Sequence, residues 1–81
     1  MKRISWTERA KADVRALDKP TAMRVLSGLH RFAQTGSGDV KALQGEEEMR
    51  LPIGDYRLFF VDLPDGAIEV RHVRHRSEAY R

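Results

Sequence analysis

The spacing of apolar residues changes once along this chain, from a helical period to a strand period, and the change falls near Gly36. Before this point apolar side chains recur every three or four positions, as at Ala10, Val14 and Leu17, which is the period of a helix with one buried face. After it they alternate with polar residues, as in residues 49–53, which is the period of a strand with one buried face. A chain that is helical first and strand-rich afterwards is predicted to be an α+β protein with its helices packed on a sheet.

Two helices joined by a short loop are expected in the first half. Residues 5–8 fit a capping box and Thr7 is an alternative N-cap, so the first helix begins in this segment. Residues 18–20 interrupt the helical pattern. Pro20 is tolerated in a first helical turn, because its missing N–H would be unpaired there, so a second helix is expected to begin near it. This helix is expected to end at the segment Gly36-Ser37-Gly38, since glycine adopts the left-handed conformation that terminates helices.

Four strands and two turns are expected around the helices. The strands are residues 4–6, 49–53, 56–63 and 68–73, and the turns are residues 54–55 and 64–66. Pro52 cannot donate to a neighbouring strand, so it is expected at a sheet edge or a bulge. The expected fold is one domain over residues 1–81. It has an N-terminal strand and a two-helix hairpin on one face of an antiparallel sheet that ends in a three-stranded meander.

The strand at residues 56–63 carries large apolar side chains on both faces. Alternation sends one set of side chains to each face: Tyr56, Leu58 and Phe60 to one, and Arg57, Phe59 and Val61 to the other. Two helices cover only one face. The other face is therefore expected to expose apolar surface or to bury it against a protein partner.

Composition excludes several kinds of site. The 81 residues contain no cysteine, which removes disulfides, cysteine-based zinc sites and thiol nucleophiles. No apolar run approaches the roughly 18 residues of a membrane span, and the N-terminus has no signal-peptide core, so a cytoplasmic protein without membrane contact is expected. His72 and His75 would face opposite sides of a strand, so no metal is expected there, and no cofactor is expected. The acidic run at residues 46–48 is interpreted as a solvated loop.

Charge is distributed unevenly along the chain, although the net charge is only +3. Residues 1–35 carry eight basic and three acidic side chains, residues 36–70 carry three and eight, and residues 71–81 carry four arginines against one glutamate. A basic N-terminal third and a basic tail favour a polyanionic partner, and equally fit solvated ends of a small domain.

Basic and aromatic side chains gather at strand positions and in the tail. They are Arg50, Arg57, His72, Arg74, His75, Arg76 and Tyr80. Arginine offers a planar fork of donors that matches phosphate oxygens, and a phosphorane carries more negative charge than the diester from which it forms. RNA supplies its own nucleophile in the 2′-OH, so its cleavage needs only proton transfer and charge stabilisation. Plain phosphate binding and catalysis both remain open on these residues alone.

Four short motifs make the chain similar to a known family. They are Lys41-Ala-Leu43-Gln-Gly45, Arg50-Leu51, Gly54-Asp55-Tyr56-Arg57-Leu58 and His75-Arg76-Ser-Glu-Ala-Tyr80. With these motifs the chain resembles the RelE/ParE superfamily of bacterial toxins over nearly its whole length. The resemblance implies an endoribonuclease that cuts mRNA on the ribosome and is held inactive by a cognate antitoxin, with operator DNA bound only through the antitoxin complex. It also implies a strand, a helical hairpin and an antiparallel sheet.

The resemblance also implies roles for individual residues. Arg57 corresponds to the arginine that binds the scissile phosphate, Arg76 to a second arginine that stabilises the transition state, and Tyr80 to the tyrosine that orients the substrate base. Two basic residues, usually lysines, precede the Gly-Asp turn in the family. Here these positions hold Arg50 and Pro52.

The departure at Pro52 leaves the proton-transfer group open, because arginine, with a pKa above ~12, is a poor base at neutral pH. His75 is a candidate for this role, since some relatives use a histidine near the C-terminus as a general acid and imidazole titrates in the useful range. Further phosphate contacts are expected from Lys41, Arg71, Arg74 and Arg81.

Three functions fit the resemblance. The first is a metal-independent mRNA-cleaving toxin that uses Arg57, Arg76 and Tyr80. The second, after the ParE branch, is a non-enzymatic toxin that binds and poisons DNA gyrase. The third is a degenerate toxin that only binds its antitoxin. The fold is shared among these and does not choose between them.

Overall fold

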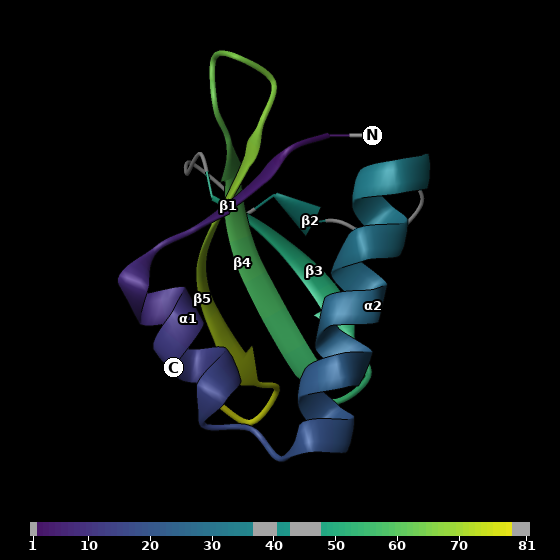
Figure 1. Ribbon diagram of the computed structural model, residues 1–81, viewed down its shortest axis with the longest axis vertical. Helices are drawn as coiled ribbons and strands as arrows, with labels where there is room; N and C mark the ends of the chain where they lie inside the picture. Colours follow the sequence, from purple (N-terminus) through teal and green to yellow (C-terminus); the bar gives the residue numbers. More distant parts are fainter. Residues whose placement is uncertain (1, 37–40, 43–47, 79–81) are drawn as a thin grey trace.

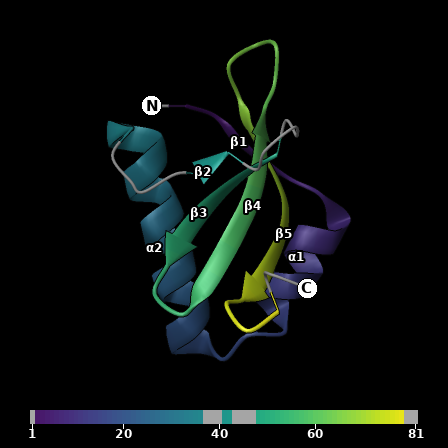
Figure 2. The same cartoon turned by 180° about the vertical axis from the view of Figure 1, so that it is seen from behind.

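A computed structural model describes residues 2–36, 41–42 and 48–78 of the chain, with Lys41 and Ala42 described in their backbone only. The elements follow in the order β1 (Ile4–Trp6), α1 (Glu8–Arg15), α2 (Lys19–Thr35), β2 (Lys41–Ala42), β3 (Met49–Ile53), β4 (Tyr56–Asp62) and β5 (Ile68–His75). Both helices lie on the same face of one sheet, in front of it in Figure 1 and behind it in Figure 2. The predicted α+β fold with a two-helix hairpin is confirmed.

The sheet has the strand order β1-β5-β4-β3-β2. The meander of β3, β4 and β5 is antiparallel, as predicted. β1 pairs in parallel with β5, with Ile4 opposite Ile68 and Trp6 opposite Val70, so the sheet is mixed rather than wholly antiparallel. The two-residue strand β2, which pairs with the start of β3, was not predicted because two residues carry no alternation pattern.

Each helix begins at a side-chain cap. The Thr7 hydroxyl accepts a hydrogen bond from the Ala10 N–H at 3.1 Å, and the Asp18 carboxylate accepts one from the Thr21 N–H at 3.2 Å. These bonds satisfy N–H groups that have no partner within the helix. The second helix ends at Gly36, whose φ of 71° is left-handed, as the sequence predicted.

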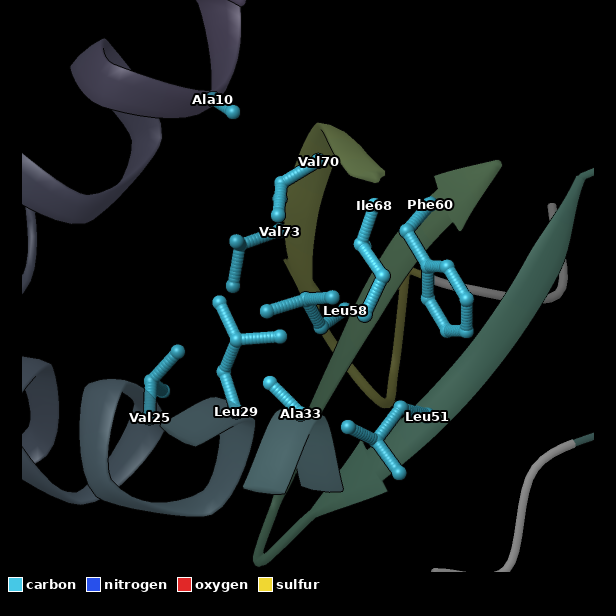
Figure 3. Packing of buried hydrophobic residues seen from close by; sticks show 10 residues of the cluster. All are labelled: Ala10, Val25, Leu29, Ala33, Leu51, Leu58, Phe60, Ile68, Val70 and Val73. Atoms are coloured by element: carbon cyan, nitrogen blue, oxygen red, sulfur yellow. The ribbon is translucent and has the colours of Figure 1, made fainter. Parts of the chain in front are cut away.

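The core lies between the helices and the inner face of the sheet, and Figure 3 shows its side chains. α2 supplies Val25, Leu29 and Ala33, which recur every four residues along its buried stripe, and α1 supplies Ala10. The sheet supplies Leu51, Leu58, Phe60, Ile68, Val70 and Val73. The opposite face of the sheet, which points away from the helices, is not part of this core and carries polar side chains as well.

The two long edges of the meander are closed differently. β1 pairs with β5 only as far as Val70. From Arg71 onward the edge of β5 is covered by α1 and its N-cap, since the Thr7 hydroxyl donates to the Arg71 carbonyl at 2.9 Å and the Asp13 carboxylate accepts from the Val73 N–H at 3.0 Å. On the other side the pairing of β2 extends only to Arg50, so among the described residues β4 is the only strand beside Pro52 and β3 is an edge strand there. The predicted edge position of Pro52 is confirmed.

The sheet face away from the helices, called the open face below, does not expose the apolar side chains that the sequence suggested. Phe59 and Val61 are only 4% and 7% exposed. The large apolar side chains that are exposed among the described residues are Met23 at 54% and Leu26 at 38%, both on α2. The expectation of an exposed apolar sheet face was therefore wrong, and the exposed apolar surface lies on the helix side.

Candidate functional site

The turn between β3 and β4 anchors Arg57. Gly54 has a φ of 58°, a left-handed conformation that glycine adopts without strain, and this tightens the turn. Arg57 alternates with the core residue Leu58, so its side chain leaves β4 on the open face. Its Nη1 donates to the Gly54 carbonyl at 3.1 Å and to the Tyr56 carbonyl at 2.9 Å. Within the described part of the chain Arg57 has no carboxylate partner, so its charge is not neutralised by a neighbour.

Arg76 contacts the same turn, between β3 and β4, from the end of β5. It follows β5, its N–H donates to the Asp55 carbonyl at 2.8 Å, and its Nε lies 3.9 Å from the Asp55 carboxylate. The side chain is exposed, and an exposed ion pair of this length is weak. Two arginines 19 positions apart in sequence thus contact adjacent residues of one turn, Gly54 and Asp55.

Arg74 adds a third cation beside Arg57. The two residues are directly opposite each other on β5 and β4. Like charges in this position repel, and an anion between them removes the repulsion. The Arg74 guanidinium lies 3.8 Å from the Glu78 carboxylate. The arrangement is that of a site for an anion with several oxygens, such as a phosphate diester.

Arg50 lies further along the open face. It is opposite Phe59, which is two residues beyond Arg57 on β4. The structure therefore brings Arg50, Arg57 and Arg74 to one face of the sheet, with Arg76 at its end.

His75 is not brought to this face. It pairs with Tyr56, and the two rings meet edge to face with their centres 5.3 Å apart. His75 follows the core residue Val73 by two positions, so its side chain leaves β5 on the helix side, where it lines a pocket of about 230 Å³ with Asp13 and Leu17 of the helix layer and with Arg74 at the sheet edge. Its Nδ1 accepts a hydrogen bond from the Ser77 N–H at 3.2 Å. A proton transfer by His75 to a group at Arg57 would have to pass around the sheet edge.

The other residues predicted for the site are dispersed. Arg71 is the extra residue of a bulge in β5, is exposed and lies 2.9 Å from the Glu69 carboxylate. Lys41 is in β2, where only its backbone is described. Tyr80 and Arg81 lie outside the described residues, so their predicted roles stay predictions.

Sequence reasoning missed a pair on the open face. The Glu48 carboxylate lies 3.4 Å from His72 Nε2, and the His72 ring stacks on Phe59 with the ring centres 4.3 Å apart. Glu48 was interpreted as part of a solvated acidic run, yet its side chain is only 23% exposed. One signal was available, because Glu48 precedes Arg50 by two residues, and continuing the alternation of the strand by one residue puts both side chains on one face. Residues 46 and 47 lie outside the described residues.

A groove runs along the helix side of the molecule. It has a volume of about 630 Å³ and lies between β1 and α2, lined by Ile4, Trp6, Leu26, Ser27, Leu29, His30, Arg31, Gln34 and Thr35. A neighbouring pocket of about 240 Å³ extends it towards α1, where Lys11 and Arg15 are added to Trp6 and Leu26. The floor is apolar and the charged lining residues are all basic.

The described residues contain neither a membrane-spanning helix nor a cluster of metal-binding side chains. No described helix is long and apolar enough to cross a bilayer. Among residues 2–36, 41–42 and 48–78, no three side chains of His, Asp or Glu gather in a way that could hold a metal ion.

Solved structures define the class of fold. The isolated RelE toxin of E. coli is similar with a TM-score of 0.78 and 19% identity, covering 99% of this chain and 92% of that one. The RelE chain of the RelE–RelB complex from Pyrococcus horikoshii has a TM-score of 0.76 and 22% identity, covering 96% and 98%. The RelB–RelE antitoxin–toxin complex from Methanococcus jannaschii gives 0.74 and 20%, covering 94% of each chain. At these identities the likeness shows a RelE-like fold.

The sequence itself assigns the family. A family model described as the ParE toxin of type II toxin–antitoxin systems, parDE, matches residues 4–80. Because this match spans nearly the whole chain, the protein belongs to the ParE toxin family of type II toxin–antitoxin systems, and the resemblance to the RelE/ParE superfamily is confirmed. No curated protein sequence matches the chain significantly.

Proposed function

We propose that this toxin cleaves mRNA on the ribosome, in the cytoplasm, without a metal ion. The observation that carries the proposal is the gathering of Arg57, Arg74 and Arg76 around one end of the open face. In the proposed reaction the 2′ oxygen bonds to phosphorus while the bond to the 5′ oxygen breaks. The 2′-OH loses its proton and the 5′ oxygen gains one, which leaves a 2′,3′-cyclic phosphate and a 5′-OH.

In this proposal the arginines stabilise negative charge on the phosphate and do not transfer protons. Arg57, held at Nη1 by two backbone carbonyls, directs its remaining donors to the scissile phosphate. Arg76, held only by an exposed pair with Asp55, turns to the phosphorane as its charge develops. Tyr80 remains a candidate for orienting the base. Arg71, Arg81 and Lys41 remain candidates for contacts further along the RNA.

The proposed regulator is a cognate antitoxin. The similar RelE chains from Methanococcus jannaschii and Pyrococcus horikoshii were solved in complex with RelB. On this chain the helix-side groove around Trp6 and Leu26 fits an acidic amphipathic segment, since its floor is apolar and its charged lining is basic. Operator DNA would be bound through the antitoxin rather than through this chain.

A gyrase poison is the second candidate. The observation that favours it is the match to the ParE family model, together with Pro52 at a position where RNA-cleaving relatives have a basic residue. A toxin that only binds its antitoxin is the outcome if neither activity is found.

One experiment separates the three. After induction in cells, primer extension maps breaks in mRNA, and a supercoiling assay with purified gyrase measures inhibition. Ribosome-dependent breaks that Arg76→Ala reduces about 10²- to 10³-fold would support the nuclease, because removing one donor to a developing oxyanion has this effect. Gyrase inhibition without breaks would replace it with the poison.

A further inference from the structure

We propose that Glu48 reads a guanine base of the bound RNA and that His72 positions its carboxylate for this. The inference rests on the proposed mRNA cleavage and adds the base specificity of the same face. It starts from the Glu48 carboxylate, which lies near Arg50, Arg57 and Arg74 on the open face, the face seen from the front in Figure 2 along β3, β4 and β5. The carboxylate of Glu69, also on this face, is instead paired with Arg71. A carboxylate repels phosphate, so RNA can approach this point with a base rather than with its backbone.

The imidazole is held in one orientation. The His72 ring is stacked on Phe59 with an interplanar angle of 6°, and Phe59 is 4% exposed, so the stack is part of the packed structure. His72 Nδ1 is buried and has no hydrogen-bond partner within the described residues. Nε2 is the nitrogen that faces Glu48, at 3.4 Å.

This geometry fixes the roles of the two side chains. A buried N–H without an acceptor is costly, so the favoured neutral tautomer carries its hydrogen on Nε2 and donates it to Glu48. Glu48 then presents a carboxyl group whose Oε1 is held by the imidazole. Each carboxylate oxygen accepts two hydrogen bonds, so both oxygens retain capacity for a ligand. With 23% of its side chain exposed, Glu48 is accessible from the open face.

The ligand follows from the chemistry of the acceptor. A carboxylate offers two acceptors side by side and no donor. Among the four bases only guanine has two adjacent donors, N1–H and the N2 amino group, on its Watson–Crick edge. Adenine, cytosine and uracil each place an acceptor beside their donor, which repels the second carboxylate oxygen. Single-stranded RNA is read on this edge because its bases are unstacked.

The Glu48–His72 pair lies close enough to the arginines for a single RNA strand to contact both. Glu48 directly precedes β3 and is two residues from Arg50, and it contacts His72, which is two residues from Arg74 on the same face of β5. Two residues of a strand span about 6.6 Å. The base-reading pair is therefore separate from the arginine cluster at the β3–β4 turn but close enough for neighbouring nucleotides to contact both.

The test uses the full chain in single-turnover cleavage on ribosomes programmed with mRNAs that differ at each base of the codon in the decoding site. Wild type should cleave fastest with guanine at one position, and inosine there, which lacks the N2 amino group, should slow it. A bidentate contact to a base discriminates by about 5- to 150-fold. Glu48→Gln should lose most of this preference while still cutting.

Two further variants distinguish a role in guanine recognition from a purely structural role of His72. His72→Phe keeps a ring on Phe59 but removes Nε2, so it should weaken the guanine preference; a purely structural His72 would leave it unchanged. Glu69→Gln is the matched control, because Glu69 is a half-buried carboxylate of β5 paired with Arg71 instead, and it should keep the wild-type preference.

The outcomes are distinct. Cleavage without a guanine preference, or with a preference that Glu48→Gln retains, overturns this inference and leaves the nuclease standing. No cleavage by wild type overturns the proposed function and this inference with it. If Glu48→Gln does not fold, the inosine substitution on wild type still decides.

Discussion

At the scale of single residues, Arg57 combines a structural and a functional use of one guanidinium. Its Nη1 contacts two carbonyls of the turn that carries it, and within the described residues this is the only end that is bonded. Lysine has one compact ammonium group and could not hold the turn and present a second donor edge at the same time. The residue type at this position is therefore set by geometry as well as by charge.

Replacing Arg57 tests this division of roles. Arg57→Ala should abolish growth arrest and lower mRNA cleavage about 10²- to 10³-fold, because the phosphate loses its fixed donor. The domain should still fold, as checked by circular dichroism and a thermal melt. Arg24→Ala, an exposed arginine on α2, serves as the matched control. Undiminished toxicity of a well-expressed Arg57→Ala protein would contradict the assignment.

Asp65 gives a pH dependence at the same scale. The Ala67 N–H donates to its carboxylate at 3.0 Å, and this bond, followed by the nearby charge of Arg3, holds the pKa of Asp65 below its usual value. A lowered pKa in the folded state stabilises the fold above the ordinary Asp range, and this stabilisation is lost as the pH falls through the lowered value.

The expected measurement is a melting temperature at several pH values. Asp65→Asn should melt below wild type at neutral pH, and the difference should shrink as the pH falls through the lowered pKa of Asp65, where the wild-type carboxylate becomes protonated. Ser5→Ala, an exposed position without a titrating group, should show a difference that does not change with pH. A constant gap for Asp65→Asn would contradict the prediction.

At the scale of elements, the contact between α2 and β3 depends on a missing side chain. A Cβ added at Gly28 would lie 2.9 Å from Ile53 Cγ2 and 3.1 Å from two more atoms of that side chain. Glycine inside a helix costs about 1 kcal/mol relative to alanine. The close approach of the helix to the strand offsets this cost.

A double-mutant cycle separates the two effects. Gly28→Ala should destabilise wild type, because Ile53 must move, but should stabilise an Ile53→Ala background by up to about 1 kcal/mol through helix propensity. Urea unfolding of the four proteins measures this. If Gly28→Ala stabilises both backgrounds equally, Ile53 does not limit the approach of the helix.

At the scale of the whole molecule, the proposed RNA site and the proposed antitoxin groove lie on opposite sides of the sheet. The arginines and the Glu48–His72 pair lie on the open face, while the groove with Trp6 and the exposed Leu26 lies on the helix side. A partner segment in the groove can therefore anchor the complex without contacting the arginines.

Leu26 tests this separation. Leu26→Asp places a negative charge on the groove floor and should weaken binding of the antitoxin by at least 10-fold while mRNA cleavage by the free toxin stays at the wild-type level. Isothermal titration calorimetry and the cleavage assay measure the two. Lys19→Asp, an exposed change at the start of α2 outside the groove lining, is the control. Equal binding by Leu26→Asp would place the antitoxin elsewhere.

The sequence was informative where local rules apply and not where distant segments meet. The helices, the cap at Thr7, the start of the second helix near Pro20, the turns and the edge position of Pro52 follow from periodicity and residue chemistry. The parallel pairing of β1 and the covering of the β5 edge by Asp13 join residues about 60 positions apart, and no local pattern encodes them.

The candidate site shows the same limit. Alternation placed Arg57 on the open face, but the contact of Arg76 with the turn at Asp55 could not be derived from spacing. His75 and His72 differ by three positions, which predicts opposite faces, and the structure has them there. Which of the two histidines joins the arginines became evident only from the packing of the helices.

The parallel pairing of β1 with β5 has a consequence for the time at which the protein becomes active during synthesis. The first strand of the chain pairs with the last, through Ile4 and Ile68, so a nascent chain leaving the ribosome cannot complete its sheet until its C-terminal segment has emerged. Arg74 and Arg76 belong to that same late segment. The arginine cluster therefore cannot assemble before β5 has left the ribosome and paired with β4, so the site forms later in synthesis than the two helices and the β3–β4 hairpin.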